Sequence, residues 1–146
     1  GIEPLQLFDE YGNEIKDQYP KPWSIDDCKQ IIKKIHETYP IKQLAMTFRE
    51  NISVNRNRLK ALLSDGKLFY ESEEVEVEIV DRVGTGDAFS AGIIYSLINH
   101  YEPQEAVEFA KACFALKHTI EGDGNLLQLS DINQFLHQKG AVTIKR

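Results

Sequence analysis

The chain has 146 residues, of which 42% are hydrophobic and 27% charged, a balance typical of one globular domain or of part of a larger one. The formal net charge of −6 argues against nucleic acid as a partner, because nucleic-acid-binding proteins usually carry a basic face. No apolar run reaches the ~20 residues of a membrane span, and two cysteines suit a reducing compartment, so we expect a cytoplasmic protein with no membrane contact. Because the chain begins at Gly1 and has its only methionine at Met46, we expect it to be part of a longer protein.

The first half of the chain predicts a loop-rich entry over 1–22, followed by a helix. Ser24 with Asp27 three residues later predicts the helix start, and Pro40 marks its end. The apolar run 41–48 then predicts a buried strand, with a polar stretch over 49–58 after it.

Two strand-like runs follow, over 59–63 and 67–71, and the Asp65-Gly66 pair between them predicts a hairpin. Valine or isoleucine alternates with glutamate over 74–79, which predicts a strand across 71–80 whose glutamates form the solvated face.

The second half predicts helices over 88–99 and 103–120. The first is apolar nearly all round, so we expect it to be buried on most sides. A turn cluster at 122–125 precedes a final helix that we expect Ser130 to cap and that ends near Gly140, before a last strand over 141–144. The order of these elements predicts an α/β fold.

The glycine-rich turn between the predicted strand and the helix at 88–99 has the chemistry of a phosphate site. Gly84 and Gly86 allow close backbone approach, and the N–H groups of 84–87 point outward where the helix dipole adds roughly half a positive charge. Asp87 is a carboxylate among donors suited to phosphate, which makes sense if it accepts a proton from a substrate hydroxyl. The alternative is that Asp87 caps the helix and the glycines only form a tight turn.

The stretch Asp81-x-x-Gly84-Thr85-Gly86-Asp87-Ala88-Phe89 resembles the second signature of the ribokinase-like (pfkB) carbohydrate kinases. Segments 46–51, 79–84 and 114–119 are similar to those of the 2-keto-3-deoxygluconate kinases. The resemblance implies the C-terminal part of a ribokinase-like three-layer α/β/α domain, with a β-hairpin before the catalytic loop. Residues 1–146 would form the nucleotide-binding and catalytic-base portion, without the N-terminal portion that holds the sugar lid.

The resemblance also implies a role for individual residues. Asp87 would deprotonate the sugar hydroxyl, Gly84, Thr85 and Gly86 would form the anion hole, and Asp123 would lie near the sugar acid. Residues 47–53 would form the loop after a strand that approaches ATP, with Arg49 near its phosphates, and Lys111 would lie beside the adenine. The implied nucleotide contacts are Thr47, Arg49, Ser53, Gly84, Gly86, Lys111 and Gly122.

ATP and Mg²⁺ are the implied cofactors, with the magnesium ligands mainly outside this chain, and a monovalent cation near the Asp81 loop is a further option. From the residues alone, Arg49 is equally a solvated loop arginine, Lys111 a surface cation and Asp123 an ordinary turn residue. Asp81 is expected to anchor the loop by accepting backbone N–H bonds. The histidines show no metal-ligand spacing, and Cys28 and Cys113 are expected to be core residues.

The first hypothesis is therefore an ATP-dependent kinase for 2-keto-3-deoxygluconate, with a small sugar acid, ATP and the N-terminal portion of the same protein as partners. The alternatives are a kinase for ribose, fructose or a related ketose, and a nucleotide-binding module without catalysis. The isolated chain is expected to show little activity, and a homo-oligomer remains open.

Overall fold

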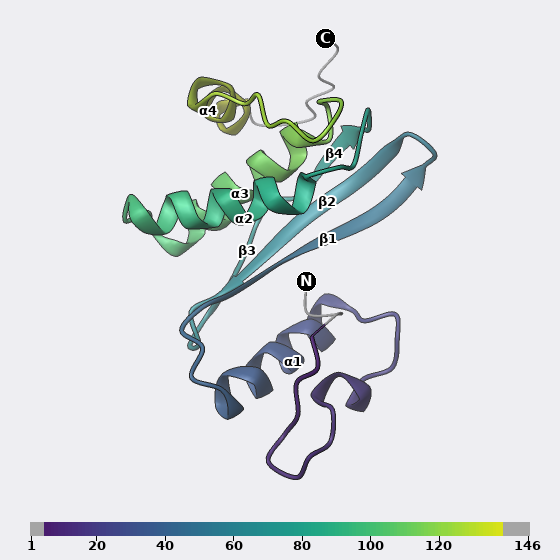
Figure 1. Cartoon of the computed structure of the whole chain (residues 1–146), viewed down its shortest axis with the longest axis vertical. Coiled ribbons are helices and arrows are strands. Elements are labelled where there is room, and N and C mark those ends of the chain that lie inside the picture. The colour runs from purple at the N-terminus through teal and green to yellow at the C-terminus, as the bar shows by residue number, and fades with distance from the viewer. Residues whose placement is uncertain (1–4, 139–146) are drawn as a thin grey trace. The chain divides into compact units, whose positions relative to one another are not determined.

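The computed structural model describes residues 5–138 of the chain (Figure 1). The chain divides into two compact units. The first comprises residues 1–46 with 63–69, and the second comprises residues 47–62 with 70–146. The elements are η1 (Ile15–Gln18), α1 (Ile25–Thr38), β1 (Leu44–Ser53), β2 (Arg56–Ser64), β3 (Phe69–Glu71), β4 (Val75–Glu78), α2 (Thr85–Ile98), α3 (Pro103–Lys117) and α4 (Leu129–His137). The α/β class is confirmed, and the last helix ends at His137, slightly before the predicted end near Gly140. The strand predicted over 141–144 lies outside the described residues.

In the first unit, α1 begins and ends where the sequence predicts. The Ser24 hydroxyl accepts a hydrogen bond from Asp27 N at 3.1 Å, and the Asp27 carboxylate accepts one from Ser24 N at 2.9 Å. These reciprocal bonds form a capping box and satisfy donors that the first helical turn leaves free. The residues that α1 buries share one stripe: Cys28, Ile31, Ile32 and Ile35.

The predicted turn at Asp65-Gly66 is confirmed. Gly66 has φ +86°, a conformation that glycine adopts at little cost, and the Asp65 carboxylate accepts hydrogen bonds from Lys67 N and Leu68 N. The turn joins β2 to β3, which are neighbours in a four-stranded sheet of order β1-β2-β3, with β4 also paired to β2.

The polar stretch 49–58, predicted to separate strands, instead lies mostly within β1 and β2, so that part of the prediction is wrong. The reason is an ion-pair network across strands. The Arg58 guanidinium donates to Glu50 at 2.9 Å and to Glu76 of β4 at 3.1 Å, and β4 runs antiparallel to β2 with Arg58 opposite Glu76. Opposite charges on neighbouring strands stabilise a solvated sheet face.

The strand predicted as continuous over 71–80 is interrupted between β3 and β4. Ser72 explains the break, because its hydroxyl oxygen accepts a hydrogen bond from Ala61 N at 2.9 Å. Ser72 N in turn donates to Ala61 O at 2.9 Å, so one residue supplies both partners of Ala61.

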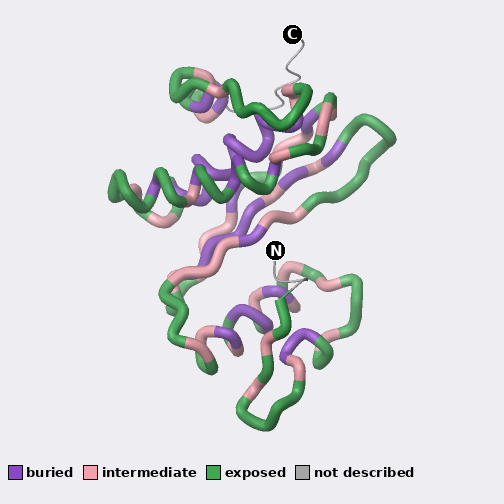
Figure 2. The backbone as a smooth tube through the Cα atoms, viewed as in Figure 1, coloured by how far each residue is buried: buried purple, intermediate pink, exposed green. Residues whose placement is uncertain are grey.

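Helices α2 and α3 run side by side in the second unit, and Figure 2 shows α3 mostly buried while α2 alternates between buried and exposed residues. They approach closely at Gly92, where a Cβ atom would lie 2.8 Å from the Cα of Ala110. The expectation that α2 is buried on most sides is wrong for the described residues, since Ile94 is 57% and Ile98 70% exposed. Only the face that includes Phe89 and Gly92 packs inward.

The start of α4 also differs from the prediction. Its N-cap is Gln128 rather than Ser130, because the Asp131 carboxylate accepts a hydrogen bond from Gln128 N at 3.0 Å and so starts the helix earlier. Cys28 and Cys113 are core residues as predicted, and burial raises the pKa of the Cys113 thiol to about 12.

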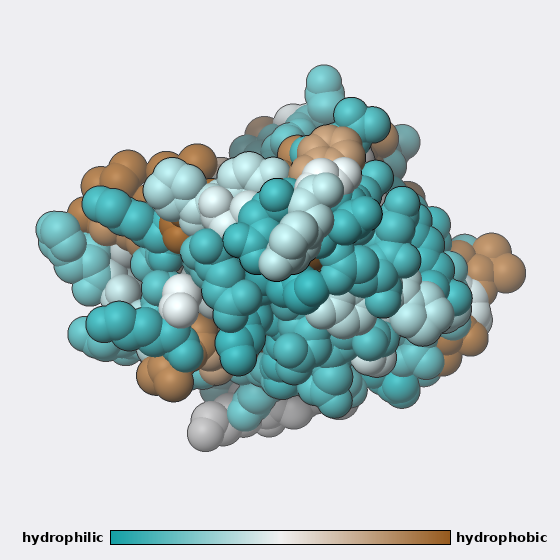
Figure 3. Space-filling view, turned by 90° about the horizontal axis from the view of Figure 1, so that it is seen from below, coloured by the Kyte–Doolittle hydropathy of each residue, from teal (hydrophilic) through white to brown (hydrophobic). Residues whose placement is uncertain are grey.

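None of the helices within 5–138 is long and apolar enough to cross a membrane. The face of the molecule that Figure 3 shows carries mainly hydrophilic side chains.

Candidate active site

The glycine-rich turn forms the N-terminus of α2, as the sequence predicts. Gly84 is the N-cap residue, with φ 71° and ψ 5° in the left-handed region. A Cβ atom at this position would lie 3.3 Å from the carbonyl oxygen of Asp123 and 3.5 Å from the Lys117 Cε, so glycine suits both the backbone and the space. Within residues 5–138, the N–H groups of Gly86 and Asp87 have no acceptor. Two donors at a helix N-terminus therefore remain available to an anion.

Asp87 lies in the first turn of α2 with an exposed side chain. Among the described residues, none donates a hydrogen bond to its carboxylate or forms an ion pair with it. The alternative that Asp87 caps the helix is wrong, because α2 has no side-chain cap hydrogen bond. An accessible carboxylate that is not engaged by other donors can accept a proton from a bound hydroxyl.

Arg49 reaches the same turn from β1. Its Nη2 donates to Thr85 Oγ1 at 3.3 Å, and its guanidinium lies 5.6 Å from the centre of the Phe114 ring. Partial burial of the guanidinium, together with the charge of Arg82, lowers the pKa of Arg49. The prediction that residues 47–53 form a loop is wrong, since Thr47, Arg49 and Ser53 all belong to β1. Arg49 is brought to the turn by a strand, which positions a side chain more rigidly than a loop.

Asp81 fixes the start of the turn, as predicted. Its carboxylate accepts hydrogen bonds from Arg82 N at 2.6 Å, Val83 N at 3.1 Å and Gly122 N at 2.8 Å. The bonds from Val83, Gly122 and Arg82, with the Lys117 charge nearby, lower the pKa of the Asp81 carboxyl. The bond to Gly122 joins segments 41 residues apart and brings Gly122 and the exposed Asp123 to the start of α2.

Sequence reasoning missed Lys117, the last residue of α3. Its side chain is fully buried, and its Nζ donates to Ile120 O at 3.2 Å and to Gly122 O at 2.6 Å. The available signal was the position of Lys117 directly after the apolar run 112–116, because a lysine that continues a buried helix face needs partners for its charge.

His118 is likewise buried beside the turn. Its Nδ1 lies 2.7 Å from Phe114 O, and because a carbonyl only accepts, Nδ1 carries the proton. Burial lowers the pKa of His118 to about 4, and the positive charges of Arg49, Arg82 and Lys117 add to the shift. Three cationic side chains, those of Arg49, Arg82 and Lys117, thus lie near a neutral imidazole at the start of α2.

Lys111 lies elsewhere, and the alternative that it is a surface cation is wrong. Its side chain is 7% exposed, its Nζ lies 3.1 Å from Glu108 Oε2, and it lies 5.5 Å from the centre of the Phe135 ring. Lys111 lines a pocket of about 1100 Å³ that none of the residues 84–87 lines. The structure therefore does not bring Lys111 together with Arg49 and the turn.

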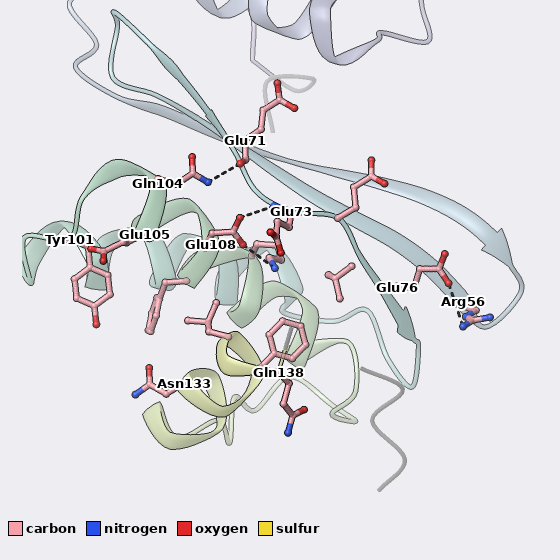
Figure 4. Close-up of a pocket in the computed structure, with 16 residues that line it drawn as sticks. Arg56, Glu71, Glu73, Glu76, Tyr101, Gln104, Glu105, Glu108, Asn133 and Gln138 are labelled. Carbon is pink, nitrogen blue, oxygen red and sulfur yellow. Dashed lines mark hydrogen bonds and ion pairs between the residues drawn. The ribbon is translucent and has the colours of Figure 1, made fainter. Parts of the chain in front are cut away.

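The pocket beside Lys111 is acidic (Figure 4). Glu108 accepts a hydrogen bond from Glu73 N, and Gln104 donates to Glu71 O. Arg56 and Lys111 are the cations among its lining residues, against six glutamates: Glu71, Glu73, Glu74, Glu76, Glu105 and Glu108. This charge balance disfavours a polyanion such as a triphosphate.

No group of three or more histidine, cysteine, aspartate or glutamate side chains within 5–138 is arranged to hold a metal ion. Among the described residues there is thus no all-protein cage for Mg²⁺, an ion that usually binds through one or two carboxylates together with substrate phosphates.

A sequence model described as pfkB family carbohydrate kinase matches residues 13–128. The chain is 32% identical over 87 residues to 2-dehydro-3-deoxygalactonokinase of Haloferax volcanii, covering 60% of this chain and 27% of that protein. The solved structure of 2-dehydro-3-deoxygluconokinase from Thermotoga maritima matches with 32% identity and a TM-score of 0.74, over 78% of this chain and 35% of that one. A putative 2-keto-3-deoxygluconate kinase from Enterococcus faecalis matches with 28% identity and a TM-score of 0.73, over 88% and 37% of the two chains. The chain thus matches only about a quarter to somewhat over a third of the length of these proteins.

Proposed function

The chain belongs to the pfkB family of carbohydrate kinases, and from this premise we propose that it is the C-terminal, nucleotide-binding and catalytic-base portion of an ATP-dependent kinase for 2-keto-3-deoxygluconate. The observation that carries the proposal is Asp87, an exposed carboxylate with no partner among the described residues, beside two N–H groups without acceptors. The names of the three matched proteins, all kinases of 2-keto-3-deoxy sugar acids, support this substrate class.

In the proposed reaction, the sugar hydroxyl oxygen attacks the γ-phosphorus of ATP while Asp87 takes the hydroxyl proton. The new bond joins that oxygen to phosphorus, and the bond from phosphorus to the oxygen bridging the β- and γ-phosphates breaks, releasing ADP. The N–H groups at Gly86 and Asp87 stabilise the charge on the transferring group, and Arg49, held by Thr85, adds a positive charge beside it.

The remaining contacts of the proposal follow from the same turn. Gly84 lies at the edge of the proposed anion hole, whereas the Thr85 N–H, which was also expected there, already donates to Arg82 O at 3.5 Å. In the proposal Gly122 lies beside the nucleotide and Asp123 near the sugar. Thr47 and Ser53 are further nucleotide contacts in the proposal. Lys111, predicted from the resemblance to lie beside the adenine, is left out of it, because the pocket that Lys111 lines is acidic and is lined by none of residues 84–87. Magnesium would be held by residues beyond those described, and the N-terminal portion of the same protein would close over the sugar. A cytoplasmic location follows from the supply of ATP.

The substitution Asp87→Asn in the intact protein tests the proposal. It removes the proton acceptor while keeping the size of the side chain, so we expect kcat to fall by about 10²–10⁴. The dissociation constant of ATP, measured by titration calorimetry, should change by less than about threefold, because a base does not hold the ground-state nucleotide.

Asp26→Asn is the matched control, since Asp26 also lies exposed in the first turn of a helix. It should leave kcat and ATP affinity as they are. Turnover by the Asp87→Asn protein equal to that of the control would refute the assignment of Asp87 as the base.

The substrate class is tested separately with a panel of sugars. The proposal expects kcat/KM for 2-keto-3-deoxygluconate or its galactonate epimer to exceed that for ribose and fructose by about 100-fold or more, since a site built for a carboxylate leaves its polar groups unpaired with a neutral sugar. Preference for a neutral sugar would replace the substrate and leave the role of Asp87 intact.

A further inference from the structure

The ammonium group of Lys117 is held by the backbone of the loop that follows α3. Lys117 Nζ donates to the carbonyl oxygens of Ile120 and Gly122, at 3.2 and 2.6 Å. Lys117 also accepts a hydrogen bond at its own carbonyl oxygen from Ile120 N at 3.2 Å. The side-chain ammonium group and the backbone carbonyl of Lys117 therefore both fix the path of residues 120–122.

A carboxylate completes the surroundings of this loop. The Gly122 N–H donates to the Asp81 carboxylate at 2.8 Å, and the Gly122 carbonyl oxygen accepts a hydrogen bond from Lys117 Nζ. Besides the backbone hydrogen bonds that Asp81 accepts, the Lys117 charge helps to lower the pKa of the Asp81 carboxyl. One residue of the loop is thus tied to a fixed cation on one side and to a fixed anion on the other.

The same lysine packs against the start of α2. A Cβ atom on Gly84 would lie 3.5 Å from Lys117 Cε and 3.3 Å from Asp123 O. The lysine side chain and the loop it holds therefore form the surface on which the N-cap of α2 rests, so their position sets the position of the turn 84–87.

Backbone carbonyls with a carboxylate nearby are the oxygen ligands that a hard cation prefers. The family resemblance leaves a monovalent cation near the Asp81 loop open, but the residues present do not fit one. The carbonyls of Ile120 and Gly122 already accept from Lys117, and a second cation beside a buried ammonium group would be repelled.

We propose that Lys117 is a positioning residue whose ammonium group takes the place of a bound monovalent cation, holding residues 120–123 against the start of α2. The turn 84–87 is then ordered without any added alkali ion. The inference rests on the contacts of Lys117 and stands independently of the reaction proposed for the protein.

Thermal melting of the full chain in chloride salts tests the inference without any activity measurement. In potassium, ammonium, sodium and choline chloride at equal ionic strength, the wild-type chain should melt at the same temperature within about 1 °C, because no free cation is part of the fold. A rise specific to potassium or ammonium in the wild-type chain would overturn the inference.

Lys117→Ala removes the cation and opens space beside the two carbonyls. In choline chloride we expect the melting temperature to fall by about 5 °C or more, because the carbonyls and Asp81 lose their partner. In potassium or ammonium chloride the variant should regain about half of that loss or more, since a free cation now enters the space. A loss that no cation recovers would show that Lys117 acts through packing alone and would overturn the inference.

Lys111→Ala is the matched control, because Lys111 is also a buried lysine of α3 but pairs with a carboxylate, Glu108, rather than with carbonyls. It should lower the melting temperature without any recovery specific to potassium. Should the alanine variant at 117 not fold in any salt, Lys117→Gln provides the same readout, since its amide keeps an N–H donor for one carbonyl but carries no charge. Recovery of the glutamine variant in potassium supports the inference, and equal melting in all salts contradicts it.

Discussion

The start of α2 and the pocket beside Lys111 are two polar regions of the same unit with opposite electrostatics. At the start of α2, the charges of Arg49, Arg82 and Lys117 act together on the buried His118, and two N–H groups have no acceptor among residues 5–138. The pocket has a volume of about 1100 Å³ but carries six glutamates against two cations. The larger cavity and the positive charge therefore lie in different places, and for a ligand with several negative charges we expect the charge to decide where it binds.

The largest effect that would sharpen this comparison is expected at Gly84. Gly84→Ala introduces a Cβ 3.3 Å from Asp123 O at a residue with φ 71°, so the turn must shift. We expect kcat/KM of the intact protein to fall about 100-fold, because a displacement of about 1 Å misplaces the reacting groups.

Gly124→Ala is the control for that variant, as Gly124 has nothing within 4 Å of its Cβ position. It should leave kcat/KM unchanged in the same assay. Equal activity of the two variants would mean that the geometry of the turn does not matter.

A smaller effect compares the two regions directly through ATP affinity. Arg49→Ala removes a charged donor beside the turn, and we expect the dissociation constant of ATP to rise about tenfold or more. Lys111→Ala removes a cation already paired with Glu108, and we expect a rise below about threefold. Titration calorimetry of both variants measures these dissociation constants. A larger rise for Lys111→Ala than for Arg49→Ala would place the phosphates in the pocket.

A last effect concerns stability rather than ligand binding, through His118 and pH. Its folded-state pKa of about 4 lies below the unfolded value of about 6.5, so the unfolded chain binds more protons between these values. Stability should therefore be complete above about pH 6.5 and fall by up to about 1.4 kcal/mol per pH unit as the pH drops towards 4.

Urea unfolding at several pH values measures this slope. His118→Gln should flatten it, whereas His137→Gln, which changes an exposed histidine of α4, should leave it in place. An unchanged slope in the His118→Gln chain would show that the histidine is not held neutral at the turn.

Local patterns in the sequence predicted the parts that depend on near neighbours. The capping box at Ser24, the turn at Gly66 and the glycine-rich start of α2 each need only a few adjacent residues. The role of Asp81 as a loop anchor was also predictable, because two of its three donors are the next two residues.

The parts that sequence reasoning missed depend on distant partners. The polar residues of β1 and β2 form strands because Arg58 pairs with glutamates on both neighbouring strands. Lys117 was missed because its acceptors are backbone carbonyls, which no sequence pattern marks. Lys111 was assigned by position in a resemblance, and its actual surroundings are set by Glu108 and Phe135.

In the function proposed above, the phosphates of ATP bind at the start of α2. Amide chemical shifts of the ¹⁵N-labelled intact protein, followed during titration with ATP, test this most directly. The account predicts that the largest shifts occur at the amides of residues 84–87, with those of Glu73, Glu105 and Glu108 at the pocket changing little. Large shifts at the pocket, with residues 84–87 unmoved, would contradict it.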